Sequence, residues 1–197
     1  MTLESFANLN LQFPTLGLMM DTASRTSYTD QVNMMTEGQH FDNLSNMDSI
    51  NENFTNFVNK QDFTTSKGVG DACHAIQDFY AHSNYVEIYC QNVADATPQN
   101  IQSYEEVMSG DNEQLKNSLK ENLRTGTFSL AGPKNSKIEG PNSHEQMNKD
   151  TPNSISGSKQ LSKNNTANAY DYARAAAVRH TTQFLEKHRD EIERMQK

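Results

Sequence analysis

The segment from residue 66 to residue 90 constrains the fold of this chain more than any other. It reads SKGVGDACHAIQDFYAHSNYVEIYC, with small and aromatic apolar residues at helical spacing. Such a wide apolar face predicts a helix that neighbouring helices cover on most sides. We therefore expect this segment to be the central helix of an all-α bundle.

Three ionisable residues interrupt the apolar pattern at intervals of four: His74, Asp78 and His82. Because a helical turn takes about 3.6 residues, their side chains lie along one stripe. Two imidazoles and a carboxylate that converge in this way are suitable zinc ligands. The alternative is an ordinary polar pair or a structural histidine, although burying three such groups without a partner charge is costly.

Three further segments have helical patterns. Residues 39–60 place apolar side chains three and four apart, and Asp42 or Asn43 could cap this helix. A short helix is expected at 111–123 and one long helix at 167–195, whose alanines mark a buried side. The sequence has no β-rich run and no internal repeat, so a helical bundle is predicted.

The composition predicts long polar excursions from this bundle. A chain of 197 residues suits one domain, 1–197, but only 34% of its residues are hydrophobic. The polar share is concentrated at about 91–165, where Asn, Ser, Gly and Lys dominate. Long loops of this kind tend to be functional or mobile, so this region could border a pocket or bind a protein partner.

Charge and the N-terminal sequence narrow the class of protein. A net charge of −8 disfavours bulk nucleic-acid binding, because an acidic surface repels phosphate backbones. The first residues lack the charged start and the unbroken apolar stretch of a signal peptide. No segment has the length of a transmembrane helix. A cytoplasmic location is the default expectation, with leaderless secretion as the alternative.

The remaining cysteines and histidines are expected to be structural or exposed. Cys73 and Cys90 lie in or near one predicted helix, which disfavours a disulfide between them and predicts reduced thiols. His180 and His188 lie on the last predicted helix, where Arg179 beside His180 suggests a position at the rim of the core.

Two segments outside the central helix hold further candidate ligands. His40 and Asp42 stand in QHFDN, just before a predicted helix. His144, Glu145 and Asp150 stand in SHEQMNKD, within the polar region. Each segment alone is typical of an exposed surface, and the second gains meaning only if its loop folds over the central helix.

Together these segments resemble the Het-C-like branch of the zinc-dependent phospholipase C superfamily. GDACHAIQDFYAHSNYVEIY resembles the signature helix of that family, QHFDN its upstream His-Phe-Asp element, and HEQMNKD with the Ala-rich helix its downstream element. The resemblance runs from about residue 38 to the end of the chain. It implies an all-α, phospholipase C/nuclease-like fold with two zinc ions, or three. The implied ligands are His40, His74, Asp78, His82, His144 and Asp150.

Several roles stay open within this resemblance. Asp78 would bridge two metals, whereas Asp42 and Asp150 could be ligands, partners of ligands or a general base. An aspartate upstream of QHFDN is also expected, either Asp21 or Asp30. The secreted phospholipases of the family use an N-terminal tryptophan as a ligand, and this sequence contains no tryptophan.

The resemblance implies phosphodiester hydrolysis by a phospholipase C that acts on phospholipid head groups, with peripheral membrane contact. Two close metals would generate hydroxide near neutral pH and stabilise the phosphoryl charge. Asp30 or Asp42 would accept the proton. Asn84 and Glu87, on the central segment, would accept hydrogen bonds from the ligand histidines.

Two other functions remain as alternatives. One is a non-catalytic recognition module of the Het-C type, with a structural metal whose coordination positions are all filled by the protein. The other is a single-strand nuclease of the same superfamily, which the acidic charge and the lack of a basic, aromatic groove disfavour. An open coordination position would favour an enzyme.

Overall fold

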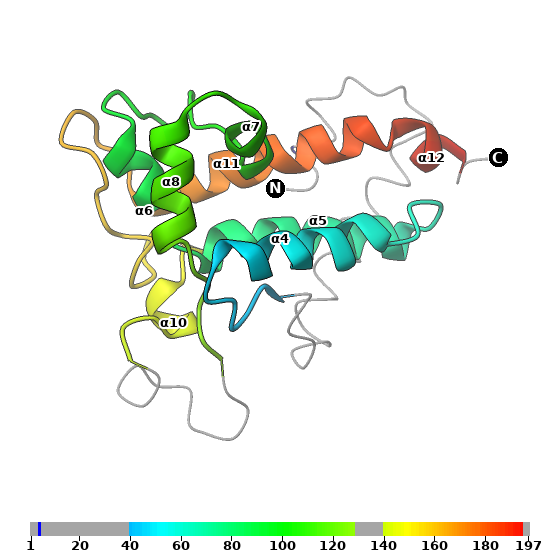
Figure 1. Ribbon diagram of the computed structural model, residues 1–197, viewed down its shortest axis with the longest axis horizontal. Helices are drawn as coiled ribbons and strands as arrows, with labels where there is room; N and C mark the ends of the chain where they lie inside the picture. Colours follow the sequence, from blue (N-terminus) through cyan, green and yellow to red (C-terminus); the bar gives the residue numbers. More distant parts are fainter. Residues whose placement is uncertain (1–3, 5–39, 129–139, 195–197) are drawn as a thin grey trace.

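The computed structural model describes residue 4, residues 40–128 and residues 140–194. Within these ranges the chain is helical and contains no strand, which confirms the all-α prediction (Figure 1). The helices are α4 (Met47–Asn56), the 3₁₀ helix η2 (Val58–Lys60), α5 (Ser66–His82), α6 (Tyr85–Asn92), α7 (Tyr104–Ser109), α8 (Glu113–Asn122), α10 (His144–Met147), α11 (Ala169–Lys187) and α12 (Arg189–Arg194).

Helix α5 is the centre of the fold, as its apolar pattern predicts. It is buried from Gly68 to His82, and α11 runs beside it in the opposite direction (Figure 1). Helix α4 contacts α5 through the rings of Phe54 and Phe79. Helices α6 and α8 pack together near the C-terminal end of α5 (Figure 1). None of the helices in the described ranges is long and apolar enough to cross a membrane.

A cluster of aromatic rings fills the space between α4, α5 and α7. The ring of Phe54 lies 4.6 Å from Phe41, 5.3 Å from Phe79 and 5.5 Å from Tyr104, measured between centroids. Rings at these separations add edge-to-face and stacking contacts to the burial of apolar area. The cluster therefore fixes α4, and the turn that contains Phe41, against α5.

The segment expected to form one helix over 66–90 is in fact two, α5 and α6, separated at Ser83 and Asn84. Here backbone and side-chain groups pair with another part of the chain. His82 O accepts a hydrogen bond from Gly126 N at 2.7 Å, and Asn84 Oδ1 accepts one from Arg124 N at 2.9 Å. The His82 carbonyl therefore has a partner without the intrahelical bond that a continuous helix would supply, and the Asn84 side chain holds the same segment at the break.

The ends of two other helices also differ from the prediction. Helix α4 begins at Met47 and is capped by Asn46, whose side chain accepts from Ser49 N, rather than by Asp42 or Asn43. The last helix is divided at His188 into α11 and α12. The polar region from 91 to 165 contains α7 and α10 in addition to the expected α8.

Cys73 and Cys90 are both free, which confirms the prediction of reduced thiols. Burial raises the pKa of the Cys90 thiol to about 12 and that of Cys73 further, so both stay protonated and unreactive near neutral pH.

His180 on α11 is a buried member of the core and not a residue of its rim. Its Nδ1 lies 2.9 Å from the hydroxyl of Tyr80, which itself accepts a hydrogen bond from Tyr104 N at 2.8 Å. Nδ1 is the acceptor within reach of the Tyr80 proton among the described residues, so this proton points to Nδ1 and the proton of the neutral imidazole is assigned to Nε2. Burial lowers the pKa of His180 from 6.5 to about 4.

This depressed pKa predicts a loss of stability in mild acid. Below pH 6.5 the unfolded chain binds a proton at His180, whereas the folded chain does not until about pH 4. The free energy of unfolding should fall across this window, by about 3 kcal/mol at most from this group. Urea unfolding at a series of pH values, for wild type and His180→Phe, measures the effect. Equal pH slopes for the two proteins would contradict it.

Candidate metal centre

Three separate segments bring ionisable side chains to the C-terminal half of α5. Helix α5 contributes His74, Asp78 and His82, all of them buried. The turn at 40–43 and the segment 142–150 approach from either side of that stripe and carry the remaining described candidates. The structure thus brings together all six of the described residues proposed as zinc ligands.

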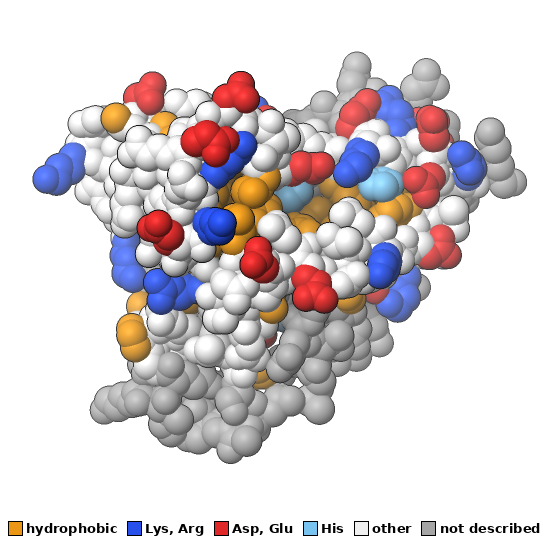
Figure 2. All heavy atoms as spheres, in the orientation of Figure 1, with side chains coloured by type: hydrophobic (Ala, Val, Ile, Leu, Met, Phe, Trp, Pro, Cys, Tyr) orange, Lys and Arg blue, Asp and Glu red, His pale blue; other side chains and the backbone are white. Residues whose placement is uncertain are grey.

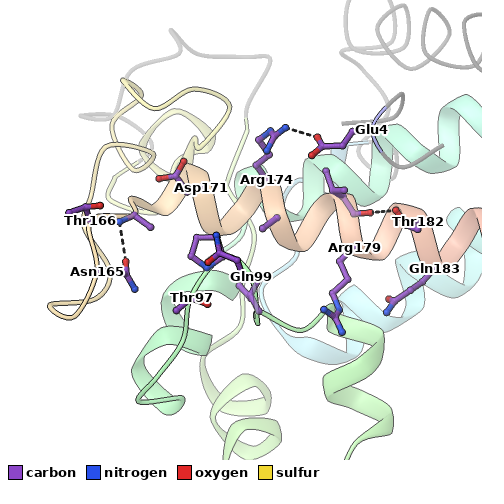
Figure 3. Close-up of a pocket in the computed structure, with 15 residues that line it drawn as sticks. Glu4, Thr97, Gln99, Asn165, Thr166, Asp171, Arg174, Arg179, Thr182 and Gln183 are labelled. Carbon is purple, nitrogen blue, oxygen red and sulfur yellow. Dashed lines mark hydrogen bonds and ion pairs between the residues drawn. The ribbon is translucent and has the colours of Figure 1, made fainter. Parts of the chain in front are cut away.

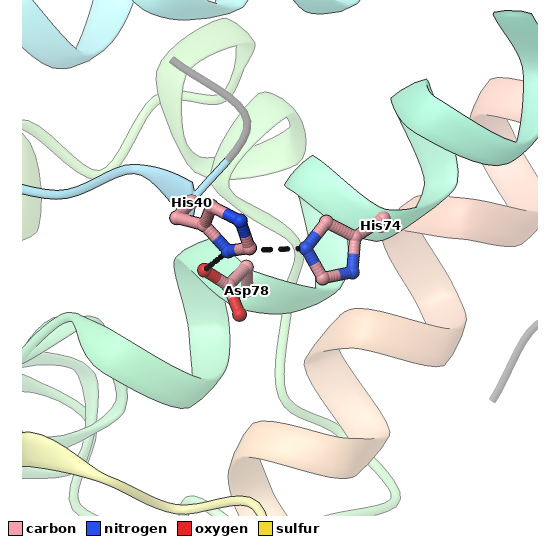
Figure 4. A group of neighbouring side chains, drawn as sticks. All are labelled: His40, His74 and Asp78. Atoms are coloured by element: carbon pink, nitrogen blue, oxygen red, sulfur yellow. Dashed lines mark hydrogen bonds and ion pairs between the residues drawn. The ribbon is translucent and has the colours of Figure 1, made fainter. Parts of the chain in front are cut away.

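The first group consists of His40, His74 and Asp78 (Figure 4). Nδ1 of His40 lies 3.2 Å from Nε2 of His74 and 3.4 Å from Oδ2 of Asp78. Figure 4 shows the two imidazoles and the carboxylate pointing toward one another, His40 from the turn and the other two from α5. One ligand atom from each of the three residues lies within 4.8 Å of the other two, so this buried group could hold a metal ion.

The second group uses the other oxygen of the same carboxylate. Nε2 of His82 lies 3.5 Å from Oδ1 of Asp78 and 3.4 Å from Oδ2 of Asp150. Asp78 therefore lies between two sets of ligands, with one oxygen toward each. The side chain of Asp150 is half exposed, so this group is open to solvent on one side.

His144 adjoins the second group and is paired with Asp42. The His144 ring stacks on that of His82, with centroids 3.7 Å apart, while its Nδ1 lies 2.7 Å from Oδ1 of Asp42. A carboxylate on one ring nitrogen fixes the orientation of the imidazole and leaves the other nitrogen for a metal. Asp42 is thus placed as the partner of His144.

The turn at 40–43 directs His40 and Asp42 to the site by an uncommon backbone conformation. Phe41 and Asn43 have φ angles of 47° and 62°, in the left-handed region that non-glycine residues seldom adopt. Burial of the Phe41 ring in the aromatic cluster stabilises this conformation and leaves His40 and Asp42 on either side of it.

An extended segment, residues 124–128, holds the three contributing segments together. Its Gly126 N donates to His82 O at 2.7 Å, and its Gly126 O accepts from Asn43 N at 2.9 Å. Its Thr127 O accepts from His144 N, also at 2.9 Å. A Cβ at position 126 would lie 2.6 Å from the Cα of His144, so only glycine allows this close approach.

Lys149 fastens the segment that carries His144 and Asp150. Its side chain is completely buried, and its ammonium donates to Ser83 O at 2.7 Å and to Met147 O at 2.9 Å. The ammonium also lies 3.3 Å from Oε1 of Glu87. The ammonium thus satisfies the carbonyl of Ser83, the residue that caps the C-terminal end of α5, where the negative end of the helix dipole favours a cation.

The electrostatics of the cluster favour positive charge. Burial alone would raise the pKa of Asp78, but His82, His40 and His74 outweigh it and lower that pKa. Burial disfavours protonated His82, yet Asp78 and Asp150 outweigh it and raise the pKa of His82 to about 9. The carboxylates are therefore ionised, and they attract either protons on the imidazoles or a metal cation.

The separations fit shared metal ligands better than direct hydrogen bonds. Two atoms bound at 2.0–2.1 Å to one tetrahedral zinc ion lie about 3.3–3.4 Å apart. The four contacts that link His40, His74, Asp78, His82 and Asp150 span 3.2–3.5 Å. Charge-assisted hydrogen bonds are shorter, about 2.7–2.9 Å. Oδ2 of Asp78 is also buried without a hydrogen bond from the described residues, so its lone pairs are available to a metal ion.

One atom does not fit this pattern. Nδ1 of His82 is buried and has no hydrogen-bond partner among the described residues, whereas ligand histidines usually donate from their second nitrogen. Of the acceptors expected for this role, Asn84 pairs with Arg124 and Asn122. Glu87 pairs with Lys149 through Oε1, and its Oε2 is itself buried without a hydrogen bond from the described residues.

The sequence interpretation missed Lys149 and the segment 124–128. A single lysine in a polar stretch carries no sign of burial, and an extended segment of five residues has too little pattern to identify. Asp21 and Asp30, the two candidates for the upstream aspartate, lie outside the described residues.

Comparisons with known proteins leave the resemblance untested. No family model, curated protein or solved structure matches this chain. The site is therefore interpreted from its own geometry.

Replacing Lys149 by methionine should destabilise the protein by about 2–4 kcal/mol, because two buried carbonyls and Glu87 lose their partner. The matched control is Lys159→Met, since Lys159 is exposed and should change stability little. Urea unfolding of the three proteins measures the difference. Equal destabilisation by both substitutions would show that Lys149 does not fasten this segment.

Proposed function

We propose that this protein is a zinc-dependent phosphodiester hydrolase of the phospholipase C type. The observation that carries the proposal is Asp78, whose two oxygens face two different groups of ligands. A carboxylate in this position suits a pair of close metal ions, and paired metals are a recurrent device for cleaving phosphate esters. The resemblance of the three ligand segments to the phospholipase C superfamily supports the same reaction.

The residues divide into sets for two ions, with one histidine beside the second set. His40, His74 and Oδ2 of Asp78 would hold the first zinc ion, and His82, Asp150 and Oδ1 of Asp78 the second. His144 would complete the second set or hold a third ion. When bound, such ions supply a Lewis acid for the phosphoryl oxygens and lower the pKa of water to near neutrality.

The protein itself would orient the site and admit the substrate. Asp42 holds the His144 ring through Nδ1, and the aromatic cluster excludes water behind the first group. Asp150 and His144 are the most exposed members of the site, with 50% and 26% of their side chains accessible. A phosphodiester head group would therefore enter at this end.

Asp42 suits the orientation of His144 better than proton transfer from water, because one of its oxygens is already engaged. Asp150 is half exposed but would accept that proton only through Oδ1, because its Oδ2 is assigned to the second zinc ion and already accepts a hydrogen bond from Asn148. Asp30 remains the other candidate for this role.

One observation favours the second candidate function, a recognition module with a structural metal. His40, His74, Asp78 and His82 are each 2–7% exposed. A site this deeply buried is compatible with an ion whose positions are all filled by protein. In that case the polar region from 91 to 165 would supply the surface for a protein partner.

Hydrolysis assays distinguish the two functions. The zinc-loaded protein should cleave bis(4-nitrophenyl) phosphate and release phosphorylated head group from phosphatidylcholine vesicles, and a chelator should abolish both activities. Asp78→Asn should lower the rate by about 100-fold or more, because both ligand sets lose a charged oxygen. Asp48→Asn, at an exposed position on α4, is the matched control.

Absence of hydrolysis by zinc-loaded protein would refute the enzyme and favour the recognition module. Cleavage of the soluble diester without cleavage of vesicles would keep the reaction and refute the lipid substrate. An Asp78→Asn rate equal to that of the control would locate the reaction elsewhere.

A further inference from the structure

A cavity lies away from the proposed metal ligands, on the side of α5 that faces α11. It has a volume of about 140 Å³ and is bordered by α4, η2, α5, α7 and α11. Figure 2 shows hydrophobic side chains and a histidine in a hollow between α7 and α4. The apolar part of its lining consists of Phe54, Val58, Ile76, Tyr104 and Phe184.

The ring of His180 offers the cavity a hydrogen-bond donor that has no acceptor among the described residues. His180 lines the cavity and is only 5% exposed. Nδ1 of this ring accepts the hydrogen bond of the Tyr80 hydroxyl, so the proton of the neutral imidazole is assigned to Nε2. Oε2 of Glu105 lies 3.7 Å from Nε2, beyond hydrogen-bond distance, and no other described residue accepts from this atom.

Charges are confined to the edge of the cavity. Glu105 and Lys187 form an ion pair there, with Nζ and Oε1 3.3 Å apart, and about half of each side chain is exposed. Since these charges neutralise each other, the cavity favours an uncharged ligand. Asn59 also lines the cavity but is exposed, so His180 is the buried polar residue of the lining. A fixed donor in a mainly apolar pocket is the usual arrangement for orienting a small molecule.

A larger hollow of about 810 Å³, along another face of α11, lacks these features (Figure 3). Its two arginines already have partners, because Arg174 pairs with Glu4 and Arg179 forms two hydrogen bonds with Glu106. Its lining is mostly polar and offers no comparable buried donor. The smaller cavity is therefore the stronger candidate for a ligand site.

We propose that the cavity at His180 binds an uncharged organic molecule of about six or seven non-hydrogen atoms, which is apolar except for one oxygen that accepts a hydrogen bond from Nε2. The size follows from the volume, since an engineered apolar cavity of about 150 Å³ binds benzene. The oxygen follows from the donor, because a buried N–H gains most from an acceptor that the protein does not supply.

Phenol and toluene test this site as matched probes, because each has seven non-hydrogen atoms and only phenol has an oxygen. The measurement is a titration of the full-length protein, labelled at histidine, followed by NMR. Phenol should shift the His180 ring resonances, show contacts to Phe54 and Phe184, and bind with a dissociation constant of about 1 mM. Toluene should bind about 3- to 10-fold more weakly.

The variant His180→Phe keeps a ring at this position and removes the donor. It should bind toluene more tightly than phenol, because the phenol hydroxyl then leaves water without a hydrogen-bond partner. Equal affinities in the wild type would refute the role of the donor, and no shift at His180 with phenol well above 1 mM would refute the site. If the variant does not fold, the comparison of probes in the wild type still decides. His180 is not a proposed zinc ligand, so neither outcome bears on the hydrolase.

Discussion

The fold of this protein is arranged around one buried carboxylate, that of Asp78. It lies on α5, which is buried from Gly68 to His82, between His40 and His74 on one side and His82 on the other. An ionised carboxylate in such a place is costly unless positive charge compensates it. The surrounding imidazoles can supply that charge as protons, but their separations match ligands that share a metal ion. A cation bound here would stabilise the folded state as well as create a reactive centre.

The remainder of the molecule keeps distant segments against this carboxylate. Residues 124–128 connect the end of α5 to the turn at 40–43 and to His144 through backbone hydrogen bonds. Lys149, in the segment 142–150, donates to the carbonyl of Ser83 at the end of α5, and so brings Asp150 to His82. The aromatic cluster performs the corresponding task for His40 by burying Phe41. Much of the polar region therefore acts as a scaffold for the site.

The sequence predicted the helices whose patterns are long and strongly apolar, and it predicted the stripe of His74, Asp78 and His82. It also selected His40, His144 and Asp150, because the resemblance supplied a context that their surroundings lack. It could not place the break at Ser83, since the local pattern continues through that residue and the competing hydrogen bonds come from Arg124 and Gly126. Burial of Lys149 and His180 depends on contacts with residues distant in sequence, which the spacing of apolar residues along the chain does not reveal.

Metal content tests the central claim most directly. The protein should be purified without added zinc and measured by elemental mass spectrometry beside the double variant His74→Ala/His82→Ala, which removes one ligand from each group. We expect about two zinc ions per chain in the wild type and a loss of zinc in the variant, because each set of ligands then lacks one histidine and keeps too few ligands for a tetrahedral zinc ion. A wild type without metal, together with a variant of unchanged fold, would contradict the account.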